Sequence, residues 1–383
     1  MPFKEAVILL KVLYVLNHAG KAGTERYVES LIAGLDKKKI KAYFVYNEEG
    51  LLADKLKGMG VETFRIAMRS RFDLKAAREI SVLCRKLSID LIHAQFLREN
   101  YIALLSRIFN PAVKVMYTNH FIMANDFVTR LSNRLLTLLE ARIIAVCNRG
   151  KEMLVRNGMS GKKIEVLFNA VDPAYWRQPM ESTLRDEFGI QEEDVVLLCA
   201  SRFAHDKGHA YLVNGLAELV KIAGKPFKCV LAGDGPLLDD VKAQVRGLGL
   251  EDKVVFTGFR SDIKNLFYGS DIYINSSEHE ALSFLILEAL ASGLPLIATD
   301  MGGNSDIVNE DTGCGILVKY GNAAELAEAV NRLMNDEKLR MELRENAYKA
   351  VDGRFNLDKM VEKTYNLYEH ACKNAERNEE KAL

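Results

Sequence analysis

Two glutamates stand in an apolar stretch of the second half of the chain. Glu280 and Glu288 are eight residues apart, and the residues around them up to Leu290 are mostly apolar. Eight residues make about two helical turns, so the spacing predicts both carboxylates on nearly the same helical face. A carboxylate in apolar surroundings needs polar partners, and Glu288 could accept from the two hydroxyls of a ribose. Backbone N–H groups at Leu282 and Ser283 could hold a phosphate; alternatively, both glutamates are simply solvated.

A second group of polar residues occupies Ser201–Gly208, directly after the first expected strand of the second half. Arg202 offers a planar fork of donors and Lys207 a point charge, and together they suit a diphosphate. The alternative is two solvated cations in an ordinary loop. His205 and His209 have the spacing of zinc ligands on a helix, but no third ligand stands nearby in the sequence. We therefore expect both histidines to be surface residues.

Two features of the first half are candidates for ligand contacts. Gly20 and Gly23 lie between the opening strand and a helix whose N-cap we expect at Thr24. Backbone N–H groups at such a helix start, with glycines that permit close approach, suit an anion, although an ordinary turn is equally consistent. His120 follows a later strand and could donate a hydrogen bond to a substrate hydroxyl or carbonyl, or it could be structural.

Short β-branched and aromatic runs alternate with helical patterns along both halves. The expected strands are residues 12–16, 42–46, 61–66, 90–96, 113–118, 142–147 and 163–168, then 195–201, 227–233, 253–258, 271–277, 294–300 and 313–319. This alternation predicts an α/β protein with parallel sheets covered by helices on both faces. Two such sheets predict two Rossmann-like domains, with ligands beyond the carboxyl ends of the strands in a deep cleft between the domains.

The charge distribution supports a division of the 383 residues near position 170. Residues 1–170 hold 28 Lys and Arg against 16 Asp and Glu, a net charge of +12, whereas residues 171–383 hold 24 against 36, a net charge of −12. Two domains also fit the length, and residues 169–180 are the expected linker. The basic half suggests an anionic partner such as nucleic acid, a phosphorylated ligand or lipid, unless the two halves simply attract each other.

Several classes of protein are disfavoured by the sequence. The six cysteines form no C-x-x-C pair, so neither a zinc site nor a disulfide framework is expected. No apolar run reaches the roughly 18 residues that a membrane span needs. Residues 1–11 are expected to lead into a strand and not to form a signal peptide. A cytoplasmic protein with reduced thiols is the default expectation.

The second half of the chain carries a family resemblance. Residues 201–208 resemble a G-R-x-x-x-x-K-G element, Glu280 and Glu288 fit a Glu-x7-Glu motif, and residues 253–308 follow the same family's core region. These motifs are similar to those of the retaining glycosyltransferases of the GT-B fold, in glycosyltransferase family 4 (group 1). The resemblance covers nearly the whole chain.

The first half carries weaker elements of the same family. Residues 22–25 resemble its glycine-rich G-G-x-E loop, and residues 90–95 resemble its D-x-I-H-x-H segment with Gln95 at the second histidine. Residues 168–176 resemble its N-G-V-D-x-x-x-F linker. Ser283 stands where many relatives have glycine, which leaves the identity of the transferred sugar open.

The resemblance implies a fold and a division of labour between domains. Residues 1–170 would form the acceptor domain, with the helix at about 357–376 returning to it, and residues 171–356 would bind a nucleotide-sugar. UDP is the favoured nucleotide. By resemblance, Arg202 and Lys207 would bind the diphosphate and Glu288 the ribose. Glu280, Leu282 and Ser283 would contact the sugar, which Gly23 and His120 would also reach. Backbone near Phe259 would contact the base. His120, Glu280, Arg202 and Lys207 would be the catalytic residues, with no metal ion and no cofactor.

The implied reaction is transfer of a hexose with retention at the anomeric carbon. We expect a same-face displacement in which the leaving phosphate deprotonates the acceptor hydroxyl. Helical patterns at 73–87 and 125–141 mix basic and apolar residues, as in helices that lie on an anionic leaflet. They could equally be core helices with a basic outer face. The expected acceptor is a lipid-linked or capsular polysaccharide precursor on the inner face of the membrane, and a soluble small acceptor is the alternative.

Other functions of this architecture remain open. A nicotinamide oxidoreductase is disfavoured because G-x-G-x-x-G is missing. A sugar-nucleotide epimerase, a phosphorylase and a catalytically silent nucleotide-sugar-binding protein share the architecture. No nucleic-acid partner is expected.

Overall fold

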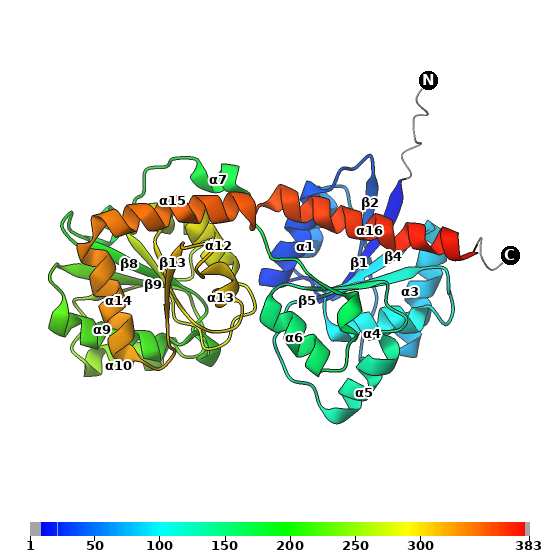
Figure 1. Cartoon of the computed structure of the whole chain (residues 1–383), viewed down its shortest axis with the longest axis horizontal. Helices are drawn as coiled ribbons and strands as arrows, with labels where there is room; N and C mark the ends of the chain where they lie inside the picture. The colour runs from blue at the N-terminus through cyan, green and yellow to red at the C-terminus, as the bar shows by residue number, and fades with distance from the viewer. Residues whose placement is uncertain (1–8, 21, 380–383) are drawn as a thin grey trace, which may run out of the picture. The chain divides into compact units, whose positions relative to one another are not determined.

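The computed structural model describes residues 9–20 and 22–379, with side chains through residue 373 (Figure 1). Of the expected lead into the first strand, residues 1–11, the part over residues 1–8 lies outside the described residues, and β1 begins at Leu10. The chain forms two compact units. Unit 1 comprises Met1–Asn169 with Leu357–Leu383, and unit 2 comprises Ala170–Asn356. Both are α/β units with an all-parallel sheet, as the sequence predicts.

The sheet of unit 1 has seven parallel strands in the order β3-β2-β1-β4-β5-β6-β7. Its strands are β1 (Leu10–His18), β2 (Ile40–Glu48), β3 (Glu62–Arg65), β4 (Leu91–Ala94), β5 (Lys114–Asn119), β6 (Arg142–Ala145) and β7 (Ile164–Val166). The central strand β1 is buried almost throughout, because helices cover a parallel sheet and its strands are therefore apolar on both faces. All seven strands fall where the sequence predicts them.

The longer helices of unit 1 bury apolar side chains, with one exception described below. They are α1 (Gly23–Gly34), α2 (Leu51–Gly58), α3 (Leu74–Leu87), α4 (Leu97–Ser106), α5 (Phe127–Leu136), α6 (Asn148–Arg156), the short η1 (Gly161–Lys163) and α16 (Leu357–Glu379). The expected N-cap at Thr24 is wrong. Ala22 is the N-cap of α1 and Thr24 is buried within the first turn, because the helix already begins at Gly23.

The last helix of the chain belongs to unit 1 and is tied to its core by a buried polar network. The hydroxyl of Tyr368 on α16 lies 3.0 Å from the Tyr14 hydroxyl and 2.7 Å from Nδ1 of His93. Nε2 of His93 lies 2.7 Å from the Thr118 hydroxyl. Burial lowers the pKa of His93 to about 3, so the imidazole is neutral and α16 is joined to β1, β4 and β5 without a charge.

Replacing Tyr368 by phenylalanine should lower the free energy of unfolding by about 1–3 kcal/mol, because it leaves the buried His93 and Tyr14 groups short of a partner. Denaturant titration measures the change. Tyr365→Phe is the matched control, since Tyr365 is only half-buried on the same helix and bonds Glu369. Equal effects of the two substitutions would show that the network contributes nothing specific.

The sheet of unit 2 has six parallel strands in the order β10-β9-β8-β11-β12-β13. They are β8 (Val195–Ala200), β9 (Phe227–Ala232), β10 (Val254–Gly258), β11 (Ile272–Asn275), β12 (Leu296–Thr299) and β13 (Gly315–Val318). The helices are α7 (Pro173–Arg177), α8 (Leu184–Phe188), η2 (His205–Lys207), α9 (His209–Ile222), α10 (Leu238–Gly247), α11 (Ile263–Tyr268), α12 (Phe284–Ala291), α13 (Asn304–Ile307), α14 (Ala323–Asn335) and α15 (Glu337–Gly353). These six strands also match their predicted ranges.

The expected linker at 169–180 is largely a structured part of unit 2. Asp172 caps α7 by accepting hydrogen bonds from the backbone N–H groups of Ala174 and Tyr175. Trp176 is buried, with its ring centroid 5.6 Å from that of Phe267. Because Trp176 is buried, this segment packs on unit 2 and is not a separate linker.

Each sheet reverses its strand order at one point, between β1 and β4 in unit 1 and between β8 and β11 in unit 2. In doubly wound sheets, ligands bind beyond the carboxyl ends of the strands at such switch points. The loop after β8 carries Arg202 and Lys207, and the loop after β11 carries Glu280. Among the described residues, no helix combines the length and apolar character needed to cross a membrane.

Candidate functional site

Lys207 lies at the switch point of unit 2 and contacts the loop after β11. Its Nζ is 2.9 Å from Oε2 of Glu280 and 3.4 Å from Oδ2 of Asp206. Burial alone would lower the pKa of Lys207, but the two carboxylates outweigh that effect and raise it above its usual value. Lys207 is therefore a permanently charged ammonium group held at the carboxyl edge of the sheet.

Gly208 allows the loop carrying Lys207 to approach β11 so closely. Its φ is +65°, and a Cβ at this position would lie 2.0 Å from the carbonyl oxygen of Ser276. Any other residue would push the two loops apart and pull Lys207 from Glu280. The sequence shows this glycine only as the end of the G-R-x-x-x-x-K-G element, and the backbone contact is its structural reason.

Arg202 is on the same loop as Lys207 but is far less constrained. Its side chain is 70% exposed, and its closest carboxylate contact is 3.9 Å, to Asp206. A guanidinium in so loose a pair can turn toward an anion with little loss of existing contacts. The expected pairing of these two cations near one ligand is thus compatible with their positions.

The expectation that Glu280 and Glu288 share a helical face is wrong. α12 begins only at Phe284, and Glu280 lies in the preceding loop. The backbone of this loop makes hydrogen bonds to neighbouring loops and not within a helix. The N–H of Glu278 donates to the carbonyl of Asp206, and the N–H of Gly303 donates to the carbonyl of Glu280. The Glu280 carboxylate also accepts from the Ser277 hydroxyl at 3.3 Å.

The remaining predicted donor residues follow along α12 and the loop after β10. Ser283 is the N-cap of α12, and Leu282 just before it is buried. Glu288 is fully buried on α12, so a ribose could reach its carboxylate only if covering groups moved. Phe259 is exposed directly after β10, where the N–H of Gly233 donates to the carbonyl of Gly258. The loops after β9 and β10 therefore adjoin at this edge.

In unit 1, His120 occupies a buried position beyond β5. Its Nε2 lies 3.0 Å from Oε1 of Gln95, and its ring meets the rings of Tyr27 and Phe96 edge-on. Burial lowers the pKa of His120 to about 3, so the ring is neutral. The amide of Gln95 is oriented by its Nε2 donating to the carbonyl of His93, which leaves Oε1 to accept from His120.

This geometry indicates which ring nitrogen of His120 carries the proton. Because Gln95 accepts through Oε1, Nε2 of His120 carries the proton and Nδ1 carries a lone pair. His120 can then accept a hydrogen bond from a substrate hydroxyl instead of donating one. Gln95 was not among the predicted site residues, although the sequence places it at the carboxyl end of a strand and at the second histidine of the D-x-I-H-x-H segment.

Replacing Gln95 by leucine should lower kcat about tenfold, because His120 loses the partner that fixes its tautomer. Gln95→Glu keeps an acceptor for Nε2, so it should retain more activity while raising the pKa of His120. The measurement is the pH profile of kcat for both variants. A merely structural role for Gln95 would leave the pH profile of Gln95→Glu unchanged.

Gly23 is the exposed first residue of α1, and no side chain caps the first turn of that helix. The expected role of its backbone in anion contact stays a prediction.

Among the described residues, no group of three His, Cys, Asp or Glu side chains comes together in a way that could hold a metal ion. His209 is not a surface residue as expected. It is buried, stacks on Phe203 at 4.0 Å and contacts the Ser201 hydroxyl, whereas His205 is exposed.

The fold defined by the two units is that of the GT-B glycosyltransferases. A glycosyltransferase from Rickettsia africae ESF-5 has a TM-score of 0.86 at 23% sequence identity, covering 95% of this chain and 99% of that one. Anabaena Alr3699/HepE, solved in complex with UDP and glucose, has a TM-score of 0.82 at 20% identity, covering 93% and 98%.

Sequence comparisons then identify the family. The model of Glycosyltransferase Family 4 matches residues 22–175, and that of Glycosyl transferases group 1 matches residues 180–350. The N-acetylgalactosamine-N,N'-diacetylbacillosaminyl-diphospho-undecaprenol 4-alpha-N-acetylgalactosaminyltransferase of Campylobacter jejuni is 30% identical over 267 residues, 67% of this chain and 70% of that protein. The N-acetyl-alpha-D-glucosaminyl L-malate synthase of Bacillus anthracis is 26% identical over 322 residues, 80% and 82% of the two chains. The chain belongs to the group 1, family 4 glycosyltransferases, which confirms the resemblance inferred from its sequence.

Proposed function

We propose that this glycosyltransferase moves a hexose from a nucleotide-sugar, with UDP as the favoured nucleotide, to an acceptor hydroxyl. Transfer retains the configuration at the anomeric carbon and needs no metal ion or other cofactor. The observation that carries the proposal is the Lys207–Glu280 pair, 2.9 Å apart at the switch point of unit 2. HepE has been solved with UDP-glucose, which supports the choice of nucleotide.

In the proposed reaction, the bond between the anomeric carbon and the diphosphate oxygen breaks, and its electron pair leaves with the diphosphate. Lys207 and Arg202 stabilise the charge that develops on the diphosphate, in the place of a divalent cation. The acceptor oxygen bonds the anomeric carbon on the same face, and its proton passes to a phosphate oxygen. Oε2 of Glu280 is paired with Lys207, which weakens the carboxylate as a nucleophile, and Oε1 accepts from sugar hydroxyls.

The other site residues have binding roles in this proposal. Glu288 accepts from the ribose hydroxyls once the groups covering it move, and Leu282 and Ser283 contact sugar or phosphate through their backbone. Backbone at Phe259 reads the base, and the Gly23 loop contacts an anionic or polar part of the substrate. His120 accepts a hydrogen bond from a substrate hydroxyl through Nδ1.

We propose a lipid-linked or cell-envelope saccharide precursor as the acceptor, reached from the cytoplasmic face of the membrane. The Campylobacter relative is named for a diphospho-undecaprenol acceptor, as is an Escherichia coli galactosyltransferase that is 25% identical over 313 residues. A small soluble acceptor is the second candidate, because the Bacillus anthracis relative, which aligns over 80% of this chain, is named for L-malate.

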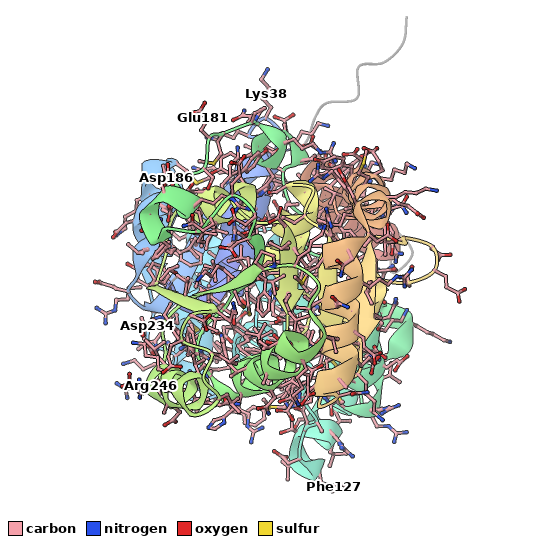
Figure 2. All side chains as sticks on the ribbon, turned by 90° about the vertical axis from the view of Figure 1, so that its left-hand side faces the viewer. Lys38, Phe127, Glu181, Asp186, Asp234 and Arg246 are labelled. Atoms are coloured by element: carbon pink, nitrogen blue, oxygen red, sulfur yellow. The ribbon has the colours of Figure 1, made fainter. Side chains whose placement is uncertain are left out.

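The donor site is tested by thermal shift of the full chain with UDP, GDP, ADP and NAD, all in EDTA. A ligand at about a hundred times its Kd should add roughly 2.7 kcal/mol of stability. One nucleoside diphosphate should raise the melting temperature of the protein, and this rise should be lost in Arg202→Ala and in Glu288→Gln. Arg246→Ala, at an exposed position on α10 of the same unit (Figure 2), is the matched control and should keep the shift.

Two results would contradict the proposed donor site: a shift with NAD alone, or no shift with any nucleotide. Where a nucleotide is identified, its sugar conjugates are then assayed for transfer in EDTA. Loss of transfer in EDTA that added Mg²⁺ restores would contradict the metal-free mechanism.

A further inference from the structure

Helix α5 of unit 1 has its polar face buried and its apolar face in solvent. The buried side chains are Thr129, Asn133 and, at the C-cap, Thr137. The exposed apolar residues of the helix and the turn after it are Phe127, Val128, Leu131, Leu135, Leu138 and Leu139, each between 47% and 79% exposed. In unit 1, α5 lies on the opposite side from α16 (Figure 1), and Phe127 stands at its outer end (Figure 2).

Hydrogen bonds fix this inverted orientation. The Tyr101 hydroxyl donates to Oδ1 of Asn133 at 2.6 Å, and Nδ2 of Asn133 donates to the carbonyl of Asn157 at 2.8 Å. The N–H of Thr129 donates to the N-cap Asp126 at 2.8 Å. Rotating α5 to bury its leucines would break these bonds and bury unpaired polar groups. These buried hydrogen bonds therefore keep the apolar face of α5 toward solvent.

The second basic amphipathic candidate, α3, is an ordinary core helix. Its buried residues include Ala76, Ala77, Ile80 and Cys84, and its arginines face solvent. The sequence gives the two helices the same mixture of basic and apolar residues, and only the structure separates them. Of the two, α5 alone presents an unpartnered apolar face.

Cations surround the apolar residues of α5. Arg130 and Arg134 are exposed on the helix itself, and residues 127–139 contain no Asp or Glu. Beyond the helix, Arg107 donates to the carbonyl of Leu139 and Lys163 to that of Leu138. The α5 surface, defined as the six exposed apolar residues with Arg130 and Arg134, thus combines apolar area with positive charge.

We propose that the α5 surface docks on an anionic lipid bilayer. Its apolar side chains enter the boundary between headgroups and acyl chains, and its arginines bind lipid phosphates. A second copy of the chain is a poorer occupant, because a two-fold contact through this face would bring each copy's arginines together. The biological sense of the inference rests on the proposed function, since a lipid-linked acceptor is presented at such a surface.

The test is sedimentation of the full chain with vesicles of phosphatidylcholine, with and without phosphatidylglycerol. We expect at least about tenfold tighter binding to the anionic vesicles, weakened by salt. The triple substitution Leu131→Gln, Leu135→Gln and Leu138→Gln should abolish binding, and Arg130→Gln with Arg134→Gln should weaken it about tenfold or more. Leu74→Gln with Val82→Gln, at exposed apolar positions of α3, is the matched control and should bind as the parent does.

The inference is overturned if the parent protein binds neither kind of vesicle, or if the triple variant binds as the parent does. Concentration-dependent dimers that the triple substitution dissolves, without vesicle binding, would overturn it in favour of a second copy. The UDP thermal shift is measured in parallel. Vesicle binding without any nucleotide shift would leave this inference standing while contradicting the proposed donor site.

Discussion

Replacing Lys207 by methionine is expected to lower kcat/KM about 10²–10³-fold, the usual effect of removing one group that stabilises charge in a transition state. Methionine keeps an unbranched side chain, one heavy atom shorter, and removes the ammonium group together with its contacts to Glu280 and Asp206. The loss should fall mainly on kcat, because the negative charge on the diphosphate grows as the glycosidic bond breaks. Steady-state kinetics of sugar transfer, with KM and kcat determined separately, measure the effect.

The control for Lys207→Met is Lys221→Met on α9 of the same unit. Lys221 also pairs with a glutamate, Glu218 at 2.8 Å, but both side chains are exposed. Its loss should change neither kinetics nor stability measurably. If Lys207→Met retained kcat/KM within about fivefold of the parent, the leaving-group role of Lys207 would be refuted.

Replacing Glu140 by glutamine is expected to raise the free energy of unfolding by about 3 kcal/mol at pH 8 and to leave it nearly unchanged below pH 4.5. Glu140 is buried in unit 1, and burial raises its pKa from 4.5 to about 7. A carboxyl whose pKa is higher in the folded than in the unfolded protein favours folding fully only below the unfolded pKa, where it is neutral in both states. That stability is lost as the pH rises from 4.5 through 7. Glutamine stays neutral and avoids the loss.

The hydrogen-bond partners of Glu140 make glutamine a suitable replacement. Nδ2 of Asn100 donates to Oε1 of Glu140 at 2.7 Å, while Oε2 of Glu140 and Oδ1 of Asn100 are buried without a partner among the described residues. A glutamine amide supplies the missing donor. Urea titrations between pH 4 and 9 measure the difference, with Glu152→Gln at an exposed position of α6 as the control. A difference that did not vary with pH would contradict the raised pKa.

The strands and the order of the sites along the chain were predictable because strands of a parallel sheet are buried on both faces. Their apolar runs are therefore nearly continuous and bounded by polar turns, as in residues 195–201. The meeting of Lys207 with Glu280 follows from the same pattern, once β8 and β11 are neighbours at a switch point. The sequence could therefore indicate that the loops carrying Lys207 and Glu280 lie at the same edge of the sheet.

Two features that the sequence did not reveal depend on contacts between distant segments. The helical face predicted for Glu280 failed because its backbone bonds the loops at Asp206 and Gly303, which no local spacing reveals. The role of His120 depends on Gln95, 25 residues away. Periodicity also identifies α5 as amphipathic without indicating which face is outside, because an inverted helix has the same period as an ordinary one.

The placement of α16 has a consequence for the order in which the protein is made. Unit 2 is continuous in the chain, but unit 1 lacks α16 until the end of the chain is synthesised. The hydroxyl of Tyr368 on α16 contacts that of Tyr14, which lies 354 positions earlier in the sequence. Until α16 is synthesised, the Tyr14 hydroxyl and Nδ1 of His93 lack their native partner, the Tyr368 hydroxyl. Unit 2 can therefore finish folding while unit 1, begun first, is still incomplete. A nascent chain that stalls before α16 would carry a finished unit 2 beside an open apolar surface on unit 1, a form that chaperones would recognise.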